Sequence, residues 1–342
     1  TPRFLANFIG PSTPPTIGTN MDEAVAVDSP YLPGTKIQYA WDSTALGYLK
    51  LCPRLYYYQM ILGWQPKDQS VHLRFGSEYA HAQNRYQLLR AEGMDFETAV
   101  REVVKEVLVS TADWDPDSQY KNRKTLIRTI IGYFDKFRND PTKIITLDDG
   151  KVACELSFRF ELDWGPKESV IKEGVFADET GMQRQPYLLC GHLDRVVTFN
   201  DDIFVMDQKT TKSKPGSYYF DQYEPENQMS FYTLAGQVLF DTQIRGVIID
   251  VAQVTINESH YERGFTYRSP DQIDEWVNDL HYWFALAEEF AKANYWPMND
   301  TSCSKYGGCK FRKICSKSPN VREKFLNADF VQQTPWNPLL TR

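Results

Sequence analysis

Two strand-like runs joined by a short polar turn make up residues 191–215, which read GHLDRVVTFNDDIFVMDQKTTKSKP. The apolar runs flank the turn at 200–202, a pattern that predicts a β-hairpin. Each run carries an aspartate, Asp194 and Asp207, although aspartate is a poor strand former. Lys209 follows two positions after Asp207, and side chains at i and i+2 point to the same face of a strand. The hairpin is therefore expected to bring two carboxylates and an amine together.

Paired acids beside a lysine suit a metal site. Two carboxylates held together repel, and the pKa of one rises unless a cation neutralises the pair. A hard divalent ion such as Mg²⁺ accepts carboxylate and backbone carbonyl oxygens together with water. A lysine beside the ion helps to orient a bound water and stabilises charge that builds on a phosphate. The alternative is an Asp–Lys ion pair on an exposed sheet face, which D-x-K alone favours. An aspartate on each strand, followed by a basic stretch, favours the metal site.

The pattern around the hairpin predicts a mixed α/β fold. Apolar residues recur at helical spacing before the sheet and between its later strands. At 153–164 the period changes to two, which predicts the first strand. The predicted helices span 41–64, 73–93, 95–110, 122–140, 226–240 and 271–294, and the predicted strands span 153–164, 187–199, 202–210, 244–256 and 263–268. This order indicates helices that flank a central sheet.

Composition narrows the class of protein. The chain has 342 residues, of which 42% are hydrophobic and 24% charged, as in an ordinary globular protein with a sizeable core. No apolar run reaches the length of a transmembrane helix, and the first residues lack the order of a signal peptide. The net charge of −7 argues against a protein that coats polyanions, although not against local nucleic-acid binding. Six cysteines without a secretory signal predict a cytoplasmic protein whose clustered cysteines bind metal.

The order of short motifs resembles that of the PD-(D/E)XK nuclease superfamily, specifically its RecB-like branch. The matching residues are Gly191, Asp194 and Arg195 for G-x-x-D-R, Asp207, Lys209 and Thr210 for D-x-K-T, Gln228 and Tyr232 for Q-x-x-x-Y, and an upstream helical histidine, His81. The resemblance covers about residues 40–316. It implies a restriction-endonuclease-like core with an N-terminal helical part and a C-terminal cysteine cluster segment.

The resemblance also implies roles for single residues. Asp194, Asp207 and His81 would be ligands of Mg²⁺ or Mn²⁺, and the backbone carbonyl of Gln208 would complete the site. Lys209 would be the catalytic lysine, and Gln228 and Tyr232 would position the nucleic acid. The implied catalytic set is Asp194, Asp207, Lys209, Gln228 and Tyr232. Without the resemblance, a lone helical histidine is more often an ordinary surface or core residue. Glu155 resembles a family acid at the head of the first strand, and a solvated strand residue is the equal alternative.

Three tail cysteines are evenly spaced, at Cys303, Cys309 and Cys315. Three thiolates cannot complete a tetrahedral site, so a fourth is expected from elsewhere in the chain. Cys154 and Cys190 lie in apolar strand patterns, where a free cysteine acts as a small hydrophobe. Cys52, in a helical segment beside a proline and basic residues, is therefore the better candidate.

Iron–sulfur members of the same nuclease branch show a similar arrangement. The CRISPR-associated spacer-trimming nucleases and the AddB nuclease domain carry one cysteine before the nuclease core and three after it. By this resemblance Cys52, Cys303, Cys309 and Cys315 would hold a four-iron four-sulfur cluster. The gap between Cys303 and Cys309 is longer than is common in those families, and an all-cysteine site also suits Zn²⁺, the alternative metal. Such a cluster would tie the two ends of the core together across about 250 residues and stabilise the fold.

A basic and aromatic stretch follows the hairpin. Lys212 and Lys214 are candidates for phosphate contacts, and Tyr218 and Tyr219 for stacking on bases. Arg195 could extend the same track. The alternative is a solvated loop with two packed tyrosines.

The leading function is a metal-dependent DNA nuclease, an exonuclease on single-stranded DNA or DNA ends that hydrolyses phosphodiesters with a metal-activated water. The alternative is a DNA-end-binding module of a recombination or CRISPR spacer-acquisition complex, and a third reading is a zinc-stabilised interaction domain. No phosphate-binding loop of a helicase is present, so unwinding would require a partner. A standalone nuclease of this kind fits a phage, acting in the host cytoplasm, or a prokaryotic defence locus.

The predicted organisation has four parts. Residues 1–36 form an irregular arm rich in proline, threonine and glycine, and 37–145 form a helical region with Cys52 and His81. Residues 146–296 form the nuclease core, and 297–342 form the iron–sulfur segment and tail.

Overall fold

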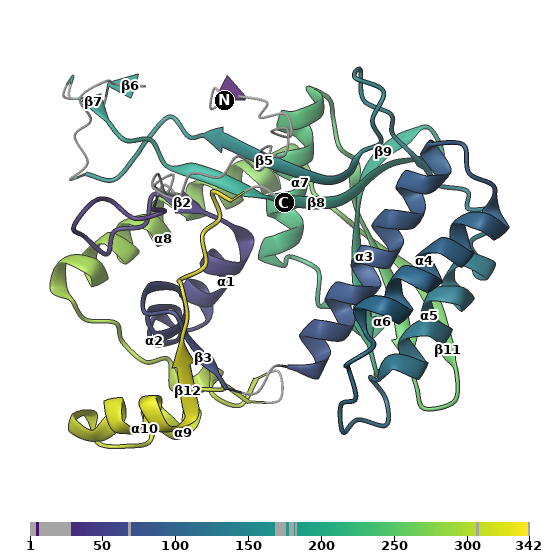
Figure 1. The fold of residues 1–342 in the computed structure, drawn as a ribbon. Helices are drawn as coiled ribbons and strands as arrows, with labels where there is room; N and C mark the ends of the chain where they lie inside the picture. The colour runs from purple at the N-terminus through teal and green to yellow at the C-terminus, as the bar shows by residue number, and fades with distance from the viewer. Residues whose placement is uncertain are drawn as a thin grey trace, which may run out of the picture. The chain divides into compact units, whose positions relative to one another are not determined.

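The computed structural model describes residues 5–6, 29–67, 70–167, 176–177, 181, 183–305 and 308–340. The chain forms two compact units that interleave along the sequence (Figure 1). Unit 1 comprises Thr1–Lys67, Ser157–Gly191 and Asp271–Arg342, and unit 2 comprises Asp68–Leu156 and His192–Pro270. These units cut across the four linear parts expected from the sequence, because the helical region 37–145 is divided between them. Most of the expected arm at 1–36 lies outside the described residues.

Unit 2 contains a mixed sheet with helices against it. Its strands are the C-terminal part of β8 (Leu188–Phe199), β9 (Asp202–Thr211), β10 (Gly246–Val254), β11 (Ser259–Tyr267) and the short β4 (Lys143–Ile144). β9 runs antiparallel to β8 and parallel to β10, while β11 runs antiparallel to β10. The parallel pair requires a crossover, which α7 (Asn227–Phe240) supplies. This arrangement confirms the mixed α/β class with a restriction-endonuclease-like sheet.

The β8–β9 turn explains why the hairpin forms. Asn200 and Asp201 both adopt left-handed backbone conformations, with φ of 49° and 66°. Two-residue turns of this kind match the twist of antiparallel strands, and asparagine and aspartate tolerate them best after glycine. The ladder pairs Phe199 with Asp202 and continues to Arg195 and Met206. The predicted hairpin is therefore confirmed, and its register follows from the turn.

Three long helices form the helical part of unit 2, namely α3 (Val71–Ala91), α4 (Phe96–Ser110) and α5 (Arg123–Lys136). The side chain of Asp95 accepts a hydrogen bond from Thr98 N at 3.0 Å and caps the start of α4. Asn122 and Thr125 form a reciprocal capping box at the start of α5. Apolar residues of all three helices share one buried cluster with Ala252 and Val254 of β10.

Unit 1 contains shorter elements. Its helices are α1 (Ser43–Leu51), α2 (Pro53–Tyr56), the π-helical turn η1 (Tyr57–Ile61), α8 (Pro270–Ala293), α9 (Arg312–Cys315) and α10 (Arg322–Asp329), with 3₁₀ turns η2 (Asp300–Ser302) and η4 (Pro319–Val321). The helix predicted for 41–64 is interrupted at Cys52, because Pro53 cannot donate the next helical hydrogen bond.

Short strands link distant parts of unit 1. β12 (Phe330–Gln332) pairs antiparallel with β3 (Trp64–Pro66), and β2 (Ala40–Trp41) runs parallel to the first residues of β8. β1 (Leu5–Ala6) pairs with the end of β5 (Cys154–Glu161), and β6 (Phe176–Ala177) pairs with β7 (Gln183–Arg184). None of the described helices is long and apolar enough to cross a membrane.

Candidate active site

The hairpin brings Asp194 and Asp207 into register. The ladder pairs Arg195 with Met206, so Asp194 lies opposite Asp207 at the next position. Asp194 Oδ2 accepts a hydrogen bond from the backbone N–H of Gln208 at 2.9 Å. The side chain of Asp207 is only 3% exposed, which places a carboxylate in the interior of unit 2. A buried carboxylate requires a cation or a proton, because desolvation disfavours its charged form.

Lys209 supplies the cation on the same strand face. Its Nζ lies 2.6 Å from Asp207 Oδ2 and donates a hydrogen bond to Gln228 Oε1 at 3.1 Å. Gln228 Nε2 in turn donates to the hydroxyl of Tyr232 at 3.1 Å, one turn along α7. The chain of contacts from Asp207 to Tyr232 brings four of the five predicted catalytic residues together, and β9 and α7 hold them.

The charges at the site shift two pKa values. Burial raises the pKa of Asp207 to about 6, and Asp194 adds to the rise while Lys209 opposes it. Burial acts to lower the pKa of Lys209, but the carboxylates of Asp207, Asp194 and Glu226 outweigh it, so this pKa is raised. Lys209 is therefore a cation at neutral pH. It stabilises negative charge and does not serve as a general base in this form.

Glu226 is an acid that the sequence patterns did not single out. Its Oε2 caps α7 by accepting hydrogen bonds from Gln228 N at 2.8 Å and Met229 N at 3.3 Å. Its charge raises the pKa values of both Asp207 and Lys209, so it lies near the site. The available signal was its place as the first residue of the helix predicted for 226–240, although glutamate is not a preferred cap residue.

Arg195 lies on the opposite strand face and is not available to DNA. It is 2% exposed, and its Nη2 donates to Asp250 Oδ2 at 3.0 Å. When the amide oxygen of Gln208 faces it, that oxygen accepts hydrogen bonds from Arg195 Nη2 and Nε at 2.9 and 3.2 Å. The expected DNA contact at Arg195 is therefore wrong, because its guanidinium is buried and neutralised by Asp250. Its contact is instead with the side chain of Gln208, the residue between Asp207 and Lys209.

His81 and Glu155 were the two further candidates for the acid site, and they differ in their surroundings. His81 is exposed on α3, and the described residues record no hydrogen bond or ion pair from it to Asp194 or Asp207. Glu155 accepts a hydrogen bond from the Asn84 side chain of α3 and has a left-handed backbone with φ of 48°. A left-handed φ is strained for a residue other than glycine, asparagine or aspartate. The structure does not bring His81 into a ligand set, and Glu155 is not a solvated strand residue.

The acid pair fits a divalent ion in part. Asp207 Oδ2 is buried and lacks a well-aligned hydrogen-bond donor, although Lys209 Nζ is close. Two facing carboxylates, one of them buried, suit a hard cation. Within the described ranges, however, no three His, Cys, Asp or Glu side chains lie close enough together to hold a metal ion. The two aspartates therefore fit part of a metal site, whose remaining ligands would be backbone carbonyls and water.

The four predicted cluster cysteines share one neighbourhood in unit 1. Cys52 Sγ accepts the N–H of Asn299 at 3.3 Å, and Cys309 and Cys315 pack against the same apolar cluster as Cys52. Cys309 N donates to Cys303 O at 2.9 Å, in the tail loop. Burial raises the pKa values of Cys309 and Cys315, and Arg54 and Arg322 oppose the rise at Cys315. Four sulfur donors fit an iron–sulfur cluster or zinc chemically, but their thiols would have to converge to bind either one.

The other two cysteines behave as predicted for apolar side chains. Cys190 is 1% exposed in unit 1, and Cys154 is half-buried in unit 2. Burial raises the pKa of each thiol to about 12, so both stay protonated at neutral pH. A protonated, buried thiol is a poor metal ligand.

The predicted DNA-contact residues after β9 are largely exposed. Lys212, Lys214 and Tyr218 lie at the surface, with Tyr218 91% exposed on α6 (Ser217–Asp221). Tyr219 is half-buried, and its hydroxyl accepts a hydrogen bond from Tyr223. An exposed ring such as that of Tyr218 can stack on a base, whereas Tyr219 is held by its neighbour.

Lys121 is a buried cation near the same strand end. It is 4% exposed, its Nζ donates to Thr210 Oγ1 at 2.9 Å, and it lies 5.2 Å from the Phe75 ring centroid. Burial lowers its pKa to about 8. The folded state thus binds fewer protons than the unfolded state between pH 8 and 10.5, and stability rises with pH across that interval.

Lys121→Met is expected to raise the free energy of unfolding at pH 7 by about 1–2 kcal/mol, because it removes a charge buried in apolar surroundings. The gain should shrink as the pH rises from 8 towards 10.5, because the wild-type amine in the folded state then loses its proton and no buried charge remains. Urea unfolding at both pH values measures the effect. The exposed Lys124→Met is the matched control and should change stability by less than about 0.5 kcal/mol. A Lys121→Met protein that is less stable than wild type at pH 7 would contradict the prediction.

Comparison with known proteins supports one family. The sequence model of the PD-(D/E)XK nuclease superfamily matches residues 43–316, which include the hairpin, α7, Cys52 and the three tail cysteines. No curated protein matches the chain significantly. The family match covers most of the chain and agrees with the sheet, the paired aspartates and the lysine described above. This chain belongs to the PD-(D/E)XK nuclease superfamily.

Proposed function

We propose that the chain is a metal-dependent deoxyribonuclease that acts as an exonuclease on single-stranded DNA or DNA ends. Members of the superfamily are nucleases and typically use Mg²⁺ or Mn²⁺. The observation that carries the proposal is the buried Asp207 carboxylate, paired with Asp194 across the hairpin and with Lys209 at 2.6 Å. A buried acid that is held beside a second acid is costly for stability, and such arrangements concentrate at functional sites.

Asp194, Asp207 and the Gln208 carbonyl would hold the metal ion. When bound, the ion would supply a water of lowered pKa as nucleophile and a positive charge beside the scissile phosphate. Asp207 and Asp194 would fix the position of that charge, since their backbone strands form one ladder. His81 would join the ligand set only after a movement of its side chain, because it is exposed and separate in the structure.

Lys209 would stabilise the charge that develops on the phosphate. Its raised pKa keeps it protonated, and its hydrogen bond to Gln228 fixes the direction of the ammonium group. Tyr232 holds Gln228 by a second hydrogen bond, so the pair on α7 positions the lysine. An ammonium group that is already in position lowers the activation barrier of hydrolysis, because it does not have to reorganise during the reaction.

The test is cleavage of end-labelled single- and double-stranded DNA by the wild-type protein. With Mg²⁺ or Mn²⁺, single strands or ends should be degraded progressively to short products, and chelation should stop the reaction. Internal cutting of a circular single strand would contradict the exonuclease assignment. The absence of cutting with either metal would contradict the enzymatic assignment as a whole.

A DNA-end-binding module is the second candidate. The observation that favours it is that no three ligating side chains converge within the described part of the chain. Such a module would bind ends within a recombination or CRISPR spacer-acquisition complex and cut little. Binding to labelled ends without cleavage in either metal would support it, with a helicase or adaptation protein as the partner.

We also propose that Cys52, Cys303, Cys309 and Cys315 hold a structural four-iron four-sulfur cluster, with Zn²⁺ as the alternative. The cluster would join α2 to the tail, which β12 and β3 already bring together. It would add to stability and take no part in cleavage.

Protein purified gently is expected to be brown and to absorb in the visible range, with iron and sulfide in equal amounts. Cys52→Ala should lose both the metal and solubility, since it removes a ligand that is buried in the apolar cluster of unit 1. Cys154→Ala is the control and should keep the metal, because its thiol lies in unit 2 and stays protonated. A colourless protein with stoichiometric zinc would replace the iron–sulfur assignment with the zinc alternative.

A further inference from the structure

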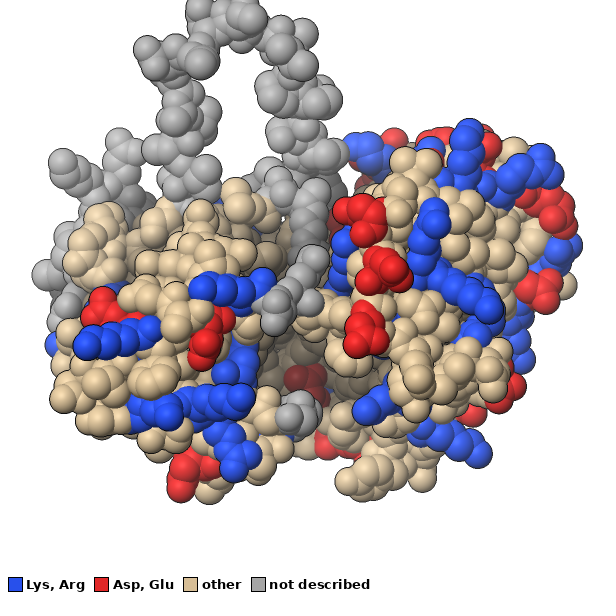
Figure 2. Space-filling model, turned by 60° about the horizontal axis from the view of Figure 1, so that its bottom comes forward, with Lys and Arg blue, Asp and Glu red and all other residues tan. Residues whose placement is uncertain are grey.

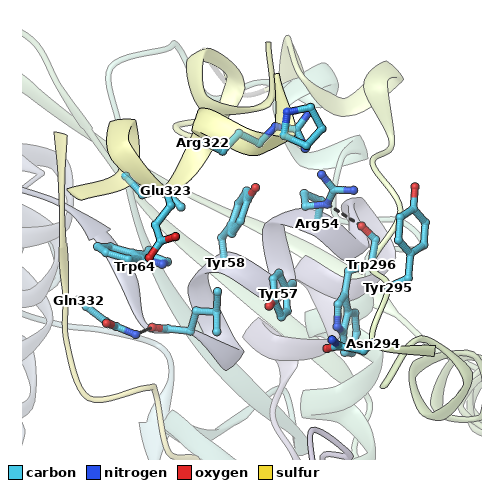
Figure 3. A pocket seen from close by; sticks show the side chains of 13 residues that line it. Arg54, Tyr57, Tyr58, Trp64, Asn294, Tyr295, Trp296, Arg322, Glu323 and Gln332 are labelled. Carbon is cyan, nitrogen blue, oxygen red and sulfur yellow. Dashed lines mark hydrogen bonds between the residues drawn. The ribbon is translucent and has the colours of Figure 1, made fainter. Parts of the chain in front are cut away.

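Unit 1 has a pocket of about 480 Å³ that the proposed catalytic chemistry does not use (Figure 3). Its walls come from α2 and η1, from the residues that follow α8, and from α10, η4 and the paired strands β3 and β12. In Figure 3, Tyr57 and Tyr58 project into the middle of the view, with Arg322 above them and Tyr295 at one side. The volume lies within the usual range of about 300–1,000 Å³ for small-molecule sites.

Five aromatic side chains line the pocket, and they differ in exposure. Trp296 is buried and stacks on Tyr57 with ring centroids 5.8 Å apart and planes at 13°. Tyr295 is 62% exposed and offers its ring to solvent. The other two, Tyr58 and Trp64, are buried in the wall. A rigid aromatic wall beside one open ring is the arrangement on which bases of single strands stack, with little regard to sequence.

An unpartnered donor also lines the pocket. The indole N–H of Trp296 is buried and has no hydrogen-bond acceptor within the described part of the chain. Tryptophan donates and never accepts through this group. A buried donor without a partner costs free energy, and an acceptor that arrives with a ligand would satisfy it. The carbonyl and ring nitrogen atoms of nucleobases are such acceptors.

Cations surround the opening. Arg54 donates through Nε to Trp296 O at 2.6 Å, and its guanidinium carbon lies 5.9 Å from the centroid of the Tyr295 ring. Arg322 lines another wall. Lys36 does not line the pocket, but its Nζ lies 5.2 Å from the ring centroid of the lining residue Tyr57. Figure 2 shows lysine and arginine side chains gathered over the α9–α10 side of unit 1. Glu323 is a lining acid, so the pocket suits a ligand with both an anionic group and hydrogen-bond donors.

We propose that this pocket binds one nucleotide of a single-stranded DNA, with its base on the Tyr295 ring and its phosphate at Arg54. Glu323 and the amide of Gln332 offer acceptors for exocyclic amino groups of a base. An aliphatic ligand would use the aromatic wall but would offer no anionic group to the arginines and no acceptor to the Trp296 N–H. That the bound nucleotide is part of a DNA strand rests on the proposed nuclease function, whereas the binding itself does not require cleavage.

The test is the affinity of a fluorescently labelled oligothymidylate in metal-free buffer, where no cleavage takes place. Tyr295→Ala should weaken binding by about 5- to 100-fold, the range expected for loss of one base stack. Tyr282→Ala is the matched control, because Tyr282 is 67% exposed on α8 of the same unit and does not line the pocket. It should bind as wild type. An oligonucleotide of abasic sites should bind wild type and Tyr295→Ala equally.

Two results would overturn the pocket assignment. One is a Tyr295→Ala affinity within twofold of Tyr282→Ala, and the other is equal wild-type affinity for thymidylate and abasic strands. Either result, with metal-dependent cleavage intact, refutes the pocket and leaves the nuclease. Loss of binding in Tyr295→Ala, in a protein that never cuts, supports the pocket and refutes the proposed enzymatic function.

Discussion

Asp207→Asn is expected to abolish cleavage and to stabilise the metal-free protein at the same time. Cleavage should fall by at least about 10³-fold, because the variant loses the charge that would hold the metal beside the phosphate. The free energy of unfolding at pH 8 should rise by about 1–3 kcal/mol, since burial raises the pKa of Asp207 to about 6 and its ionised form costs stability. Because the pKa of Asp207 is raised in the folded state, the wild-type protein loses stability as the pH rises from about 4 to 6. The stability advantage of Asp207→Asn should therefore disappear at pH 4.

Single-turnover cleavage and thermal unfolding with and without Mn²⁺ measure the two effects. Mn²⁺ should stabilise the wild type by mass action and leave Asp207→Asn unchanged. Asp202→Asn is the matched control on the same strand, because its carboxylate is 56% exposed in a loose pair with Arg245. It should cut and unfold as wild type. Cleavage by Asp207→Asn within tenfold of wild type, or a metal-free protein less stable than wild type, would contradict the account of this carboxylate.

Asp250→Ala is expected to destabilise the protein by about 3–5 kcal/mol, the cost of removing one partner from a buried ion pair. The carboxylate of Asp250 is 1% exposed and accepts from Arg195 Nη2 at 3.0 Å and from Arg263 Nε at 3.2 Å. Tyr133 also donates to it. Removal would leave the fully buried Arg195 without a counter-charge, whereas Arg263 would keep Asp140 at 2.6 Å.

Chemical unfolding measures the loss, and an exposed pair provides the comparison. Asp202→Ala breaks the Asp202–Arg245 contact at 3.7 Å, whose partners are more than half exposed, and should cost less than about 1 kcal/mol. Because Arg195 also holds Gln208 between Asp207 and Lys209, Asp250→Ala should lower the cleavage rate even below its unfolding temperature. Equal stability losses in the two variants would show that the Asp250 network does not stabilise unit 2.

The hairpin and its acids could be predicted because their signals are local. Alternation of apolar residues, the polar turn at 200–202 and the i, i+2 spacing of Asp207 and Lys209 each act within a few residues. α7 carries Gln228 and Tyr232 one turn apart, so helical geometry places them on one face. The motif order then identified the family, which the match over 43–316 confirms.

The rest depends on contacts that no local pattern encodes. Arg195 was expected to face DNA, but its partner Asp250 lies 55 positions away on another strand. The exposure of His81 depends on how α3 is rotated about its axis, which helical periodicity alone does not fix when the apolar face is broad. Lys121 is buried although lysine is mostly exposed, because Phe75 and Thr210 surround its side chain. Such contacts are set by the packing of elements that are distant in sequence.

The central claim is that the acid pair and Lys209 cut DNA. The most direct measurement is single-turnover cleavage of end-labelled single-stranded DNA with Mn²⁺, with saturating wild-type, Lys209→Met or Lys124→Met protein. The account predicts metal-dependent cleavage by wild type and Lys124→Met, and a rate about 10²- to 10³-fold lower for Lys209→Met at unchanged DNA affinity. Cleavage by Lys209→Met at the wild-type rate would contradict the claim.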